Sequence, residues 1–251
     1  MKQLSEGLSA WLMFGFRCGR GRLFSEYYLA HPIGQLLGGH GEHVLAEYPH
    51  PVIKSPKGRP IATDFVIMKQ DKVPLAIESK WAGLGEPQLK DLIWDAFRLE
   101  AFCRHTTGSG LLILAGSTNK IARLLSRKTF RRAGSSVPLL PLPQDLLKRP
   151  KTRDRSEYIL EWADLSKTVL KHLNKQDEAY PKTIGSNLYC SAPQVHAQGG
   201  PKSLSFSVYV WEIRCVPRKA PKKQKLPKMR PQKMKQPPDP LVMECAEPLT
   251  V

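Results

Sequence analysis

Residues 61–81 read IATDFVIMKQDKVPLAIESKW, and they carry the clearest structural signal in the sequence. Two mostly apolar runs flank a short polar segment around Asp71, which is the pattern of a β-hairpin. Three charged residues, Asp64, Glu78 and Lys80, interrupt the otherwise apolar strands. Burying a charge costs several kcal/mol unless the charge is paired or bound to a metal. The three residues therefore indicate either a functional site or a structural salt bridge at the end of a sheet.

The spacing of the two carboxylates predicts how they face each other. Asp64 lies seven residues before Asp71, and Glu78 lies seven residues after it. A turn centred on Asp71 places Asp64 and Glu78 opposite each other, with side chains about 5 Å apart. Glu78 and Lys80 point to the same face of their strand, because successive side chains alternate. Carboxylates this close repel each other, and a hard divalent cation such as Mg²⁺ removes the conflict by taking their oxygens as ligands.

Hydrophobic periodicity places further helices and strands around the hairpin. Ser25 opens a helix or lies early in it, and His31-Pro32 bends or restarts that helix. Pro49 and Pro51 place the second half of the next strand at a sheet edge. In chain order we expect helices over 3–16 and 26–37, a strand over 44–52, the hairpin, a helix over 88–104, a strand over 111–114 and a helix over 117–130. From residue 26 onward the order is α, β, β, β, α, β, α, which predicts a mixed α/β fold.

With this order and these charges, roughly residues 20–130 resemble the PD-(D/E)XK nuclease superfamily. The matching motif is Asp64, a gap of thirteen residues, and then Glu78-Ser79-Lys80 ahead of a helix. The resemblance implies an α/β, restriction-endonuclease-like αβββαβ core, in which helices flank a mixed central sheet and a C-terminal extension follows. It also implies metal-dependent hydrolysis of phosphodiester bonds.

The resemblance assigns a role to each residue of the motif. Asp64, Glu78 and the main-chain carbonyl of Ser79 would hold Mg²⁺ or Mn²⁺. Lys80 would orient the attacking water and stabilise the developing negative charge. Glu26, in Ser-Glu-Tyr-Tyr on the first helix of the core, would reach a second metal ion or a metal-bound water.

Alternatives stay open for three of the neighbouring positions. Glu42 and Glu47 compete with Glu26 for the role of the additional acid. Gln88 corresponds to a catalytic glutamine that some members carry, and its alternative is an ordinary polar residue at a helix start. Trp81, beside Lys80, either stacks on a nucleic-acid base or packs on the helix that follows.

The chain is strongly basic. Its 251 residues include 39 Lys and Arg against 22 Asp and Glu, a formal net charge of +17 at pH 7. A polyanion is therefore the first partner to consider, and nucleic acid fits the implied activity, with DNA favoured over RNA. The alternative to an enzyme is a basic nucleic-acid-binding protein that keeps a nuclease-like fold and cleaves nothing. The expected basic surface, on and beside the helices over 88–104 and 117–130, comprises Arg98, Arg104, Lys120, Arg123, Arg127, Lys128, Arg131 and Arg132.

Composition divides the chain into three regions. Residues 1–135 form the expected nuclease-like core. Residues 136–216 form a C-terminal region that sets specificity or extends the sheet, with a helix expected over 157–173 and a strand over 203–216. Residues 217–251 are expected to be a disordered tail, because this Lys- and Pro-rich segment lacks aromatic residues and cannot bury a core.

Cysteine usage and hydropathy bear on the location of the protein. The five cysteines are scattered and form no Cys-x-x-Cys pair, which favours a reducing compartment and hence the cytoplasm. No apolar run reaches the roughly 18 residues that a transmembrane helix needs. The sequence leaves the oligomeric state open, a homodimer included.

A chain that ends at residue 216 should keep its melting temperature, because a segment without a core contributes little to folding. Its affinity for nucleic acid should fall and its salt dependence should become shallower, since residues 217–235 carry nine Lys and Arg and no acid. Thermal melts and salt titrations of both chains measure the two effects. A drop of several degrees would show instead that the tail packs on the rest of the protein.

Overall fold

We describe the protein from a computed structural model of residues 1–251. The structure describes residues 1–39, 43–54, 60–83, 89–143, 158–160, 188–191, 193–199 and 205–215. The chain divides into two units, Met1–Val216 and Pro217–Val251, and every described residue belongs to the first. The prediction of a disordered tail therefore lies outside the described residues.

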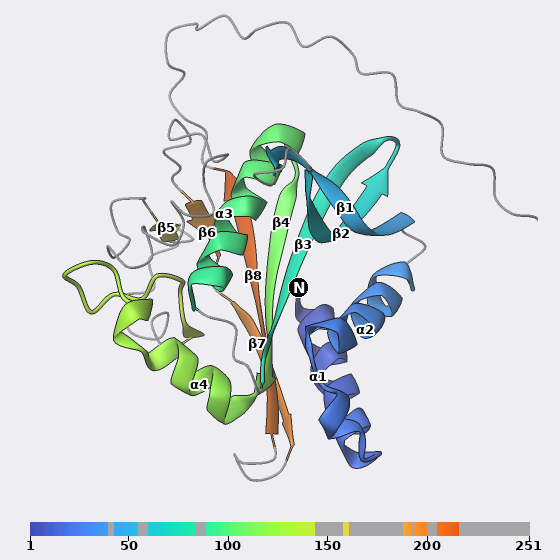
Figure 1. Ribbon diagram of the computed structural model, residues 1–251, viewed down its shortest axis with the longest axis vertical. Coiled ribbons are helices and arrows are strands. Elements are labelled where there is room, and N and C mark those ends of the chain that lie inside the picture. The colour runs from blue at the N-terminus through green and yellow to red at the C-terminus, as the bar shows by residue number, and fades with distance from the viewer. Residues whose placement is uncertain are drawn as a thin grey trace, which may run out of the picture. The chain divides into compact units, whose positions relative to one another are not determined.

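A mixed β-sheet forms the centre of the first unit (Figure 1). Its strands lie in the order β1-β2-β3-β4-β8-β6-β5, and β7 pairs with β8. The β3–β4 pair is parallel and the other pairs are antiparallel. The strands are β1 (His43–Lys54), β2 (Pro60–Lys69), β3 (Lys72–Ala82), β4 (Ser109–Ser117), β5 (Tyr158–Leu160), β6 (Leu188–Cys190), β7 (Gln194–Gly199) and β8 (Ser205–Cys215).

Helices cover both faces of this sheet (Figure 1). On one side, α1 (Lys2–Arg17) and α2 (Glu26–Gly38) pack on the strands, and on the other lie α3 (Leu89–Thr106) and α4 (Thr118–Ser126). Alternation along the strands builds the two cores, as in β4, where Ile113 faces α1 and α2 while Leu112 faces α3. The predicted mixed α/β fold, with a mixed sheet flanked by helices, is confirmed.

Several local predictions are confirmed as well. The side chain of Ser25 accepts a hydrogen bond from the Tyr28 amide at 3.2 Å, so it caps α2 as expected. Strand β1, which contains Pro49 and Pro51, lies at the edge of the sheet. α2 continues through Pro32 as one helix instead of restarting there.

Two predictions after residue 116 need correction, and a third is incomplete. The helix expected over 117–130 ends at Ser126, because Arg127 is extended and the short 3₁₀ helix η2 (Lys128–Phe130) follows it. Within the helix expected over 157–173, Tyr158–Leu160 is a strand, and the rest lies outside the described residues. The strand expected over 203–216 is confirmed as β8, but β6 and β7 beside it were not predicted.

The late strand β8 completes the middle of the sheet. It pairs with β4 along Gly110–Ser117, and its Trp211 is fully buried in the core on the α3 side. The indole N–H of Trp211 donates a hydrogen bond to the Pro141 carbonyl at 2.9 Å. Strand β4 is fully apolar over Leu111–Leu114, so its side chains need cover on both faces of the sheet. Its backbone N–H and C=O groups also need a partner strand along the edge.

We therefore expect a chain that ends at residue 135 not to fold on its own, because it exposes the apolar edge of β4. Urea unfolding followed by circular dichroism should show no cooperative transition for this chain. The chain that ends at residue 216 is the matched control and should unfold cooperatively. A cooperative transition for the shorter chain would mean that β8 is an accessory to the core.

Candidate active site

The β2–β3 hairpin places the carboxylates opposite each other by a different route from the one expected. Phe65 pairs with Ile77 and Val66 with Ala76, so the same register continued by one residue sets Asp64 opposite Glu78. The turn itself is centred between Gln70 and Asp71, both with positive φ, and Lys69 pairs with Lys72. An irregularity between Ile67 and Lys69 absorbs the difference of one residue. The register of the paired residues is therefore the one that the predicted opposition requires, although the turn is not centred on Asp71.

Asp64 bridges the two strands at this end of the hairpin. Its Oδ2 accepts hydrogen bonds from the Ser79 amide and from the Ser79 hydroxyl, both at 2.8 Å. The Ser79 carbonyl, the predicted main-chain ligand, accepts a hydrogen bond from Lys80 Nζ at 3.3 Å. One oxygen of Asp64 is thus committed to β3, and the Ser79 carbonyl lies beside an ammonium group.

Glu78 is the most deeply buried acid of the predicted motif, with 1% of its surface exposed. Its Oε1 lies 3.0 Å from Nη2 of Arg98 on α3, an ion pair without an aligned hydrogen bond to that oxygen. Burial raises the pKa of Glu78 well above its usual value, and the Asp95 carboxylate raises it further. Arg98 opposes both effects without cancelling them.

Lys80 lies between acids from two helices. Its Nζ is 2.7 Å from Oε1 of Glu26 on α2 and 3.0 Å from Oδ2 of Asp95 on α3. Burial alone would lower the pKa of Lys80, but Asp95 and Glu26 together raise it above its usual value. Burial in turn raises the pKa of Glu26 and of Asp95, and the contact with Lys80 offsets only part of that rise.

Among the three acids that competed for one role, the structure brings Glu26 to the motif. Glu26 lies in the first turn of α2, whereas Glu47 is exposed on β1 and Glu42 lies outside the described residues. Gln88 also lies outside the described residues, so its catalytic role remains a prediction. Trp81 does not pack on the following helix, since its ring lies against Phe24 and Phe206 on the other face of the sheet.

Two residues of this charged group were not predicted from the sequence, and both lie on α3. Asp95 was not considered, and Arg98 was expected on the basic surface, but Arg98 is only 7% exposed. Its guanidinium contacts Glu78 and Asp95 and donates a hydrogen bond to the main-chain carbonyl of Ala62. The available signal was an acid and a base three residues apart within the apolar stripe of a helix, where charges need partners.

A buried histidine contacts the main chain of Arg98. His50 on β1 is 3% exposed, and its Nε2 lies 3.0 Å from the main-chain carbonyl of Arg98. Its Nδ1 accepts hydrogen bonds from the amides of Val52 and Ile53, so the proton is on Nε2, which donates to that carbonyl. Burial lowers the pKa of His50 to about 4, and the ring is therefore neutral at neutral pH.

The charges at this end of the sheet do not balance. Among the described residues, Asp64, Glu78, Asp95 and Glu26 face the two cations Lys80 and Arg98, a formal excess of two negative charges when all are ionised. Carboxylate oxygens are the ligands that Mg²⁺ and Mn²⁺ prefer, so the donor chemistry suits a divalent cation. Within the described ranges, however, no group of three or more Asp, Glu, His or Cys side chains is arranged to hold a metal ion.

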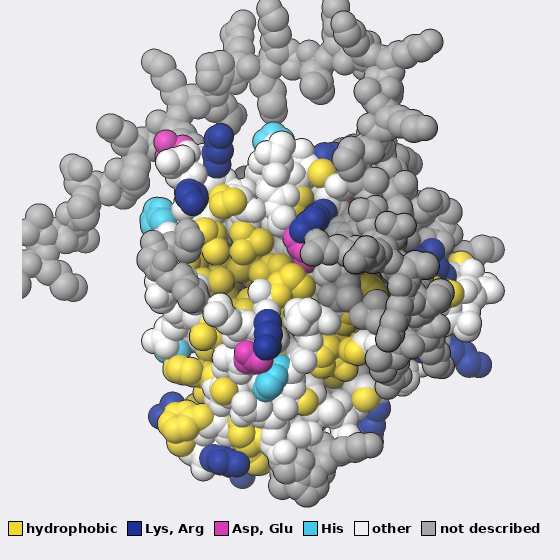
Figure 2. Space-filling view, turned by 180° about the vertical axis from the view of Figure 1, so that it is seen from behind, with side chains coloured by type: hydrophobic (Ala, Val, Ile, Leu, Met, Phe, Trp, Pro, Cys, Tyr) yellow, Lys and Arg dark blue, Asp and Glu magenta, His cyan; other side chains and the backbone are white. Residues whose placement is uncertain are grey.

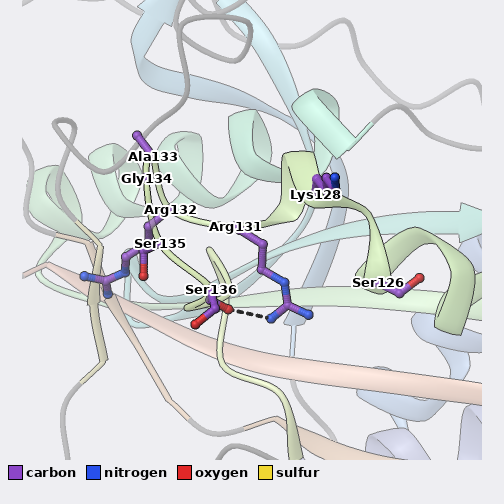
Figure 3. A pocket seen from close by; sticks show the side chains of 8 residues that line it. All are labelled: Ser126, Lys128, Arg131, Arg132, Ala133, Gly134, Ser135 and Ser136. Carbon is purple, nitrogen blue, oxygen red and sulfur yellow. Dashed lines mark hydrogen bonds between the residues drawn. The ribbon is translucent and has the colours of Figure 1, made fainter.

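The remaining basic residues of the expected surface gather around α4 and η2. Arg104 pairs with Glu100 on its own helix, whereas Arg123 and Lys128 are exposed. Residues 101–144 contain no Asp or Glu. A cavity of about 580 Å³ opens here (Figure 3), and Arg131 donates a hydrogen bond to the Ser136 carbonyl at its wall, at 3.1 Å. The lining residues are Ser126, Lys128, Arg131, Arg132, Ala133, Gly134, Ser135 and Ser136.

Comparison with protein-family models, with curated proteins and with solved structures finds no match for this chain. No helix in the described part of the chain is long and apolar enough to cross a membrane. The charged site and the surfaces around it are therefore the features that bear on the function.

Replacing Glu78 by glutamine should stabilise the protein at pH 8 and change little near pH 4.5. The folded state keeps the Glu78 proton to a higher pH than the unfolded state, so the wild type loses stability as pH rises above about 4.5. Glutamine mimics the protonated acid and avoids this loss, which is about 1.4 kcal/mol for each unit by which the pKa is raised. Urea unfolding at the two pH values measures the difference.

Arg98→Met removes the cation of this group instead of an acid, and it leaves Glu78 and Asp95 without the guanidinium that they share. It should destabilise the protein at pH 8 by about 3–5 kcal/mol. If Glu78→Gln also lowers the free energy of unfolding by about 3–5 kcal/mol at pH 8, the Glu78–Arg98 ion pair is a net stabilising contact. The excess negative charge would then not destabilise the folded protein.

Proposed function

We propose that this protein is a Mg²⁺- or Mn²⁺-dependent nuclease that hydrolyses phosphodiester bonds, with DNA favoured over RNA. The observation that carries the proposal is the meeting of Asp64, Glu78 and Lys80 with Glu26 at one end of the β2–β3 hairpin. These are the acids and the lysine that the PD-(D/E)XK resemblance requires. The described order α2-β1-β2-β3-α3-β4 is also the αβββαβ order of that superfamily, which supports the proposal.

The acids and the main-chain carbonyl of the motif would hold the metal. Asp64, Glu78 and the carbonyl of Ser79 would be its ligands, with Glu26 available to a second ion or a bound water. When bound, a divalent cation supplies charge neutralisation at the phosphate and lowers the pKa of a bound water. The formal excess of two negative charges supports this assignment, because a divalent cation would neutralise it.

Lys80 acts in this proposal as a fixed cation. Its raised pKa keeps the ammonium protonated at neutral pH, so it donates hydrogen bonds and cannot serve as the base. It would hold the attacking water or a phosphate oxygen, and it would stabilise the negative charge that develops in the transition state. Asp95, on the far side of the ammonium, positions Lys80 without needing to touch the substrate.

The basic surface around α4 and η2 would provide affinity for the substrate. Its exposed Arg and Lys side chains, and the basic cavity beside them, suit contacts to the phosphate backbone. Such contacts are insensitive to sequence and weaken with salt.

The cysteines Cys18, Cys103, Cys190 and Cys215 are free thiols, which suits the proposed cytoplasmic location.

One observation favours the alternative, a nucleic-acid-binding protein that does not cleave. Glu78, Asp95 and Glu26 already have cationic partners in Arg98 and Lys80. A network of this kind can serve structure alone. The two functions differ in their need for a divalent metal, which cleavage requires and backbone binding does not.

Asp64→Asn, Glu78→Gln and Lys80→Ala should each reduce metal-dependent cleavage by at least about 100-fold while leaving nucleic-acid binding intact. The first two remove charge at nearly constant volume, and the third removes the cation beside the phosphate. Plasmid and single-strand cleavage with Mn²⁺, with Mg²⁺ and with a chelator measures the effect. Asp71→Asn, the same chemical change in the exposed turn of the same hairpin, is the control and should cleave normally.

Salt-sensitive binding without cleavage by the wild type, under either metal, would establish the non-catalytic alternative. Cleavage that survives Asp64→Asn and Glu78→Gln would mean that the charged group is a structural network and that the active site lies elsewhere.

A further inference from the structure

Large apolar side chains are exposed where α1 ends and α2 begins. Of the six such residues in the described part of the chain, four lie between positions 14 and 27. Phe14 on α1 is 61% exposed, Leu23 on the short 3₁₀ helix η1 (Arg20–Leu23) is 63% exposed, and Tyr27 on α2 is 92% exposed. Side chains of this size are normally covered, so the local concentration indicates a contact surface.

This segment is basic as well as aromatic. Arg17, Arg20 and Arg22 are exposed in it, and residues 7–25 contain no Asp or Glu. Apolar side chains and Lys or Arg side chains alternate in Figure 2 at the lower left, where α1 ends. We call the group formed by Phe14, Arg17, Arg20, Arg22, Leu23 and Tyr27 the aromatic–arginine surface.

The three short elements that carry this surface are packed together. A Cβ added to Gly21 of η1 would lie 3.0 Å from the Phe16 ring, and one added to Gly15 of α1 would lie 2.7 Å from the Tyr28 hydroxyl. Beneath them, the ring of Phe24 contacts those of Tyr28 and Phe206, with centroids 4.8 and 5.3 Å apart. The segments that carry the surface therefore lie on a packed aromatic cluster.

Two links connect the elements that carry the aromatic–arginine surface to the candidate active site. Tyr27 directly follows Glu26, whose carboxylate lies 2.7 Å from Lys80 Nζ. Phe24 packs at 5.6 Å against Trp81, the residue after Lys80. A ligand that lies on this surface would thus reach the end of the β2–β3 hairpin.

We propose that the aromatic–arginine surface binds a single-stranded segment of nucleic acid. Exposed rings can stack on bases of any sequence, and arginines contact the phosphates between them. A duplex hides its base faces inside the helix and cannot use Tyr27 or Phe14 in this way. The inference rests on the proposed function for its purpose, which is to lead a single strand, or the single-stranded part of a duplex, to the active site.

An anionic membrane fits the same charge but not the packing. Interfacial helices insert a whole apolar face into the bilayer. The apolar face of α1, with Leu4, Leu8 and Leu12, is already buried in the core against the sheet. Only the few exposed side chains at its end would remain for insertion, so a single strand is the better occupant.

The test is fluorescence anisotropy with the full chain, a chelator and a labelled thymidine oligonucleotide of about 20 nucleotides. Tyr27→Ala should raise the Kd for this strand at least about 5-fold, because one stacked base is lost. Tyr27→Phe keeps the ring and should bind like the wild type. Affinity for a duplex of the same length should change less than about 2-fold, because phosphate contacts carry it.

An unchanged Kd for the single strand in Tyr27→Ala and in Phe14→Ala would overturn the proposal. So would wild-type binding to anionic vesicles without binding to the strand, or a dimer in sedimentation that Tyr27→Ala dissociates. Because the chelator excludes cleavage, the two proposals fail separately. If the wild type cleaves nothing with either metal and Tyr27→Ala still weakens strand binding, this inference stands and the proposed nuclease activity is refuted.

Discussion

The guanidinium of Arg98 is the contact on which the arrangement of the site depends. It donates hydrogen bonds to the Ala62 carbonyl on β2 and to Asp95 on its own helix, and it forms an ion pair with Glu78 on β3. The main-chain carbonyl of Arg98 accepts a hydrogen bond from His50 on β1. One buried residue therefore joins three strands to α3. Because Glu78, Asp95 and His50 are buried, the loss of any one of them leaves another polar group without compensation. The position of α3, and with it that of Asp95 relative to Lys80, follows from this residue.

The candidate active site is acidic, whereas the chain as a whole is basic, and the two charges act on a bound phosphate in opposite directions. The net charge of +17 attracts a polyanion from a distance, but a phosphate that reaches the end of the hairpin meets four carboxylates. Lys80 joins the two helical layers there, since Glu26 comes from α2 and Asp95 from α3. A phosphate can approach this group closely only if further positive charge accompanies it, which links metal binding to substrate binding in the proposed function.

The hairpin and its charged residues could be predicted from the sequence because their signals are local. Alternating apolar residues and a polar turn set the register, and Asp64 and Glu78 stood out as charges in apolar strands. Arg98 could not be placed in the same way, because a basic residue on a helix is normally exposed and only its partners on β2 and β3 bury it. The three-residue strands β5 and β6 carry no period, and pairing with neighbours creates them.

The position of β8 also has a consequence for the order in which the protein is made. Its partner β4 is complete at Ser117, but β8 begins only at Ser205, so nearly ninety residues are synthesised in between. At about 5–20 residues per second, the apolar edge of β4 stays uncovered for roughly 5–20 seconds on the ribosome. During that interval the nascent chain is a substrate for chaperones and a partner for other exposed strands. The yield of folded protein in the cell should thus depend on how fast the segment between β4 and β8 is translated.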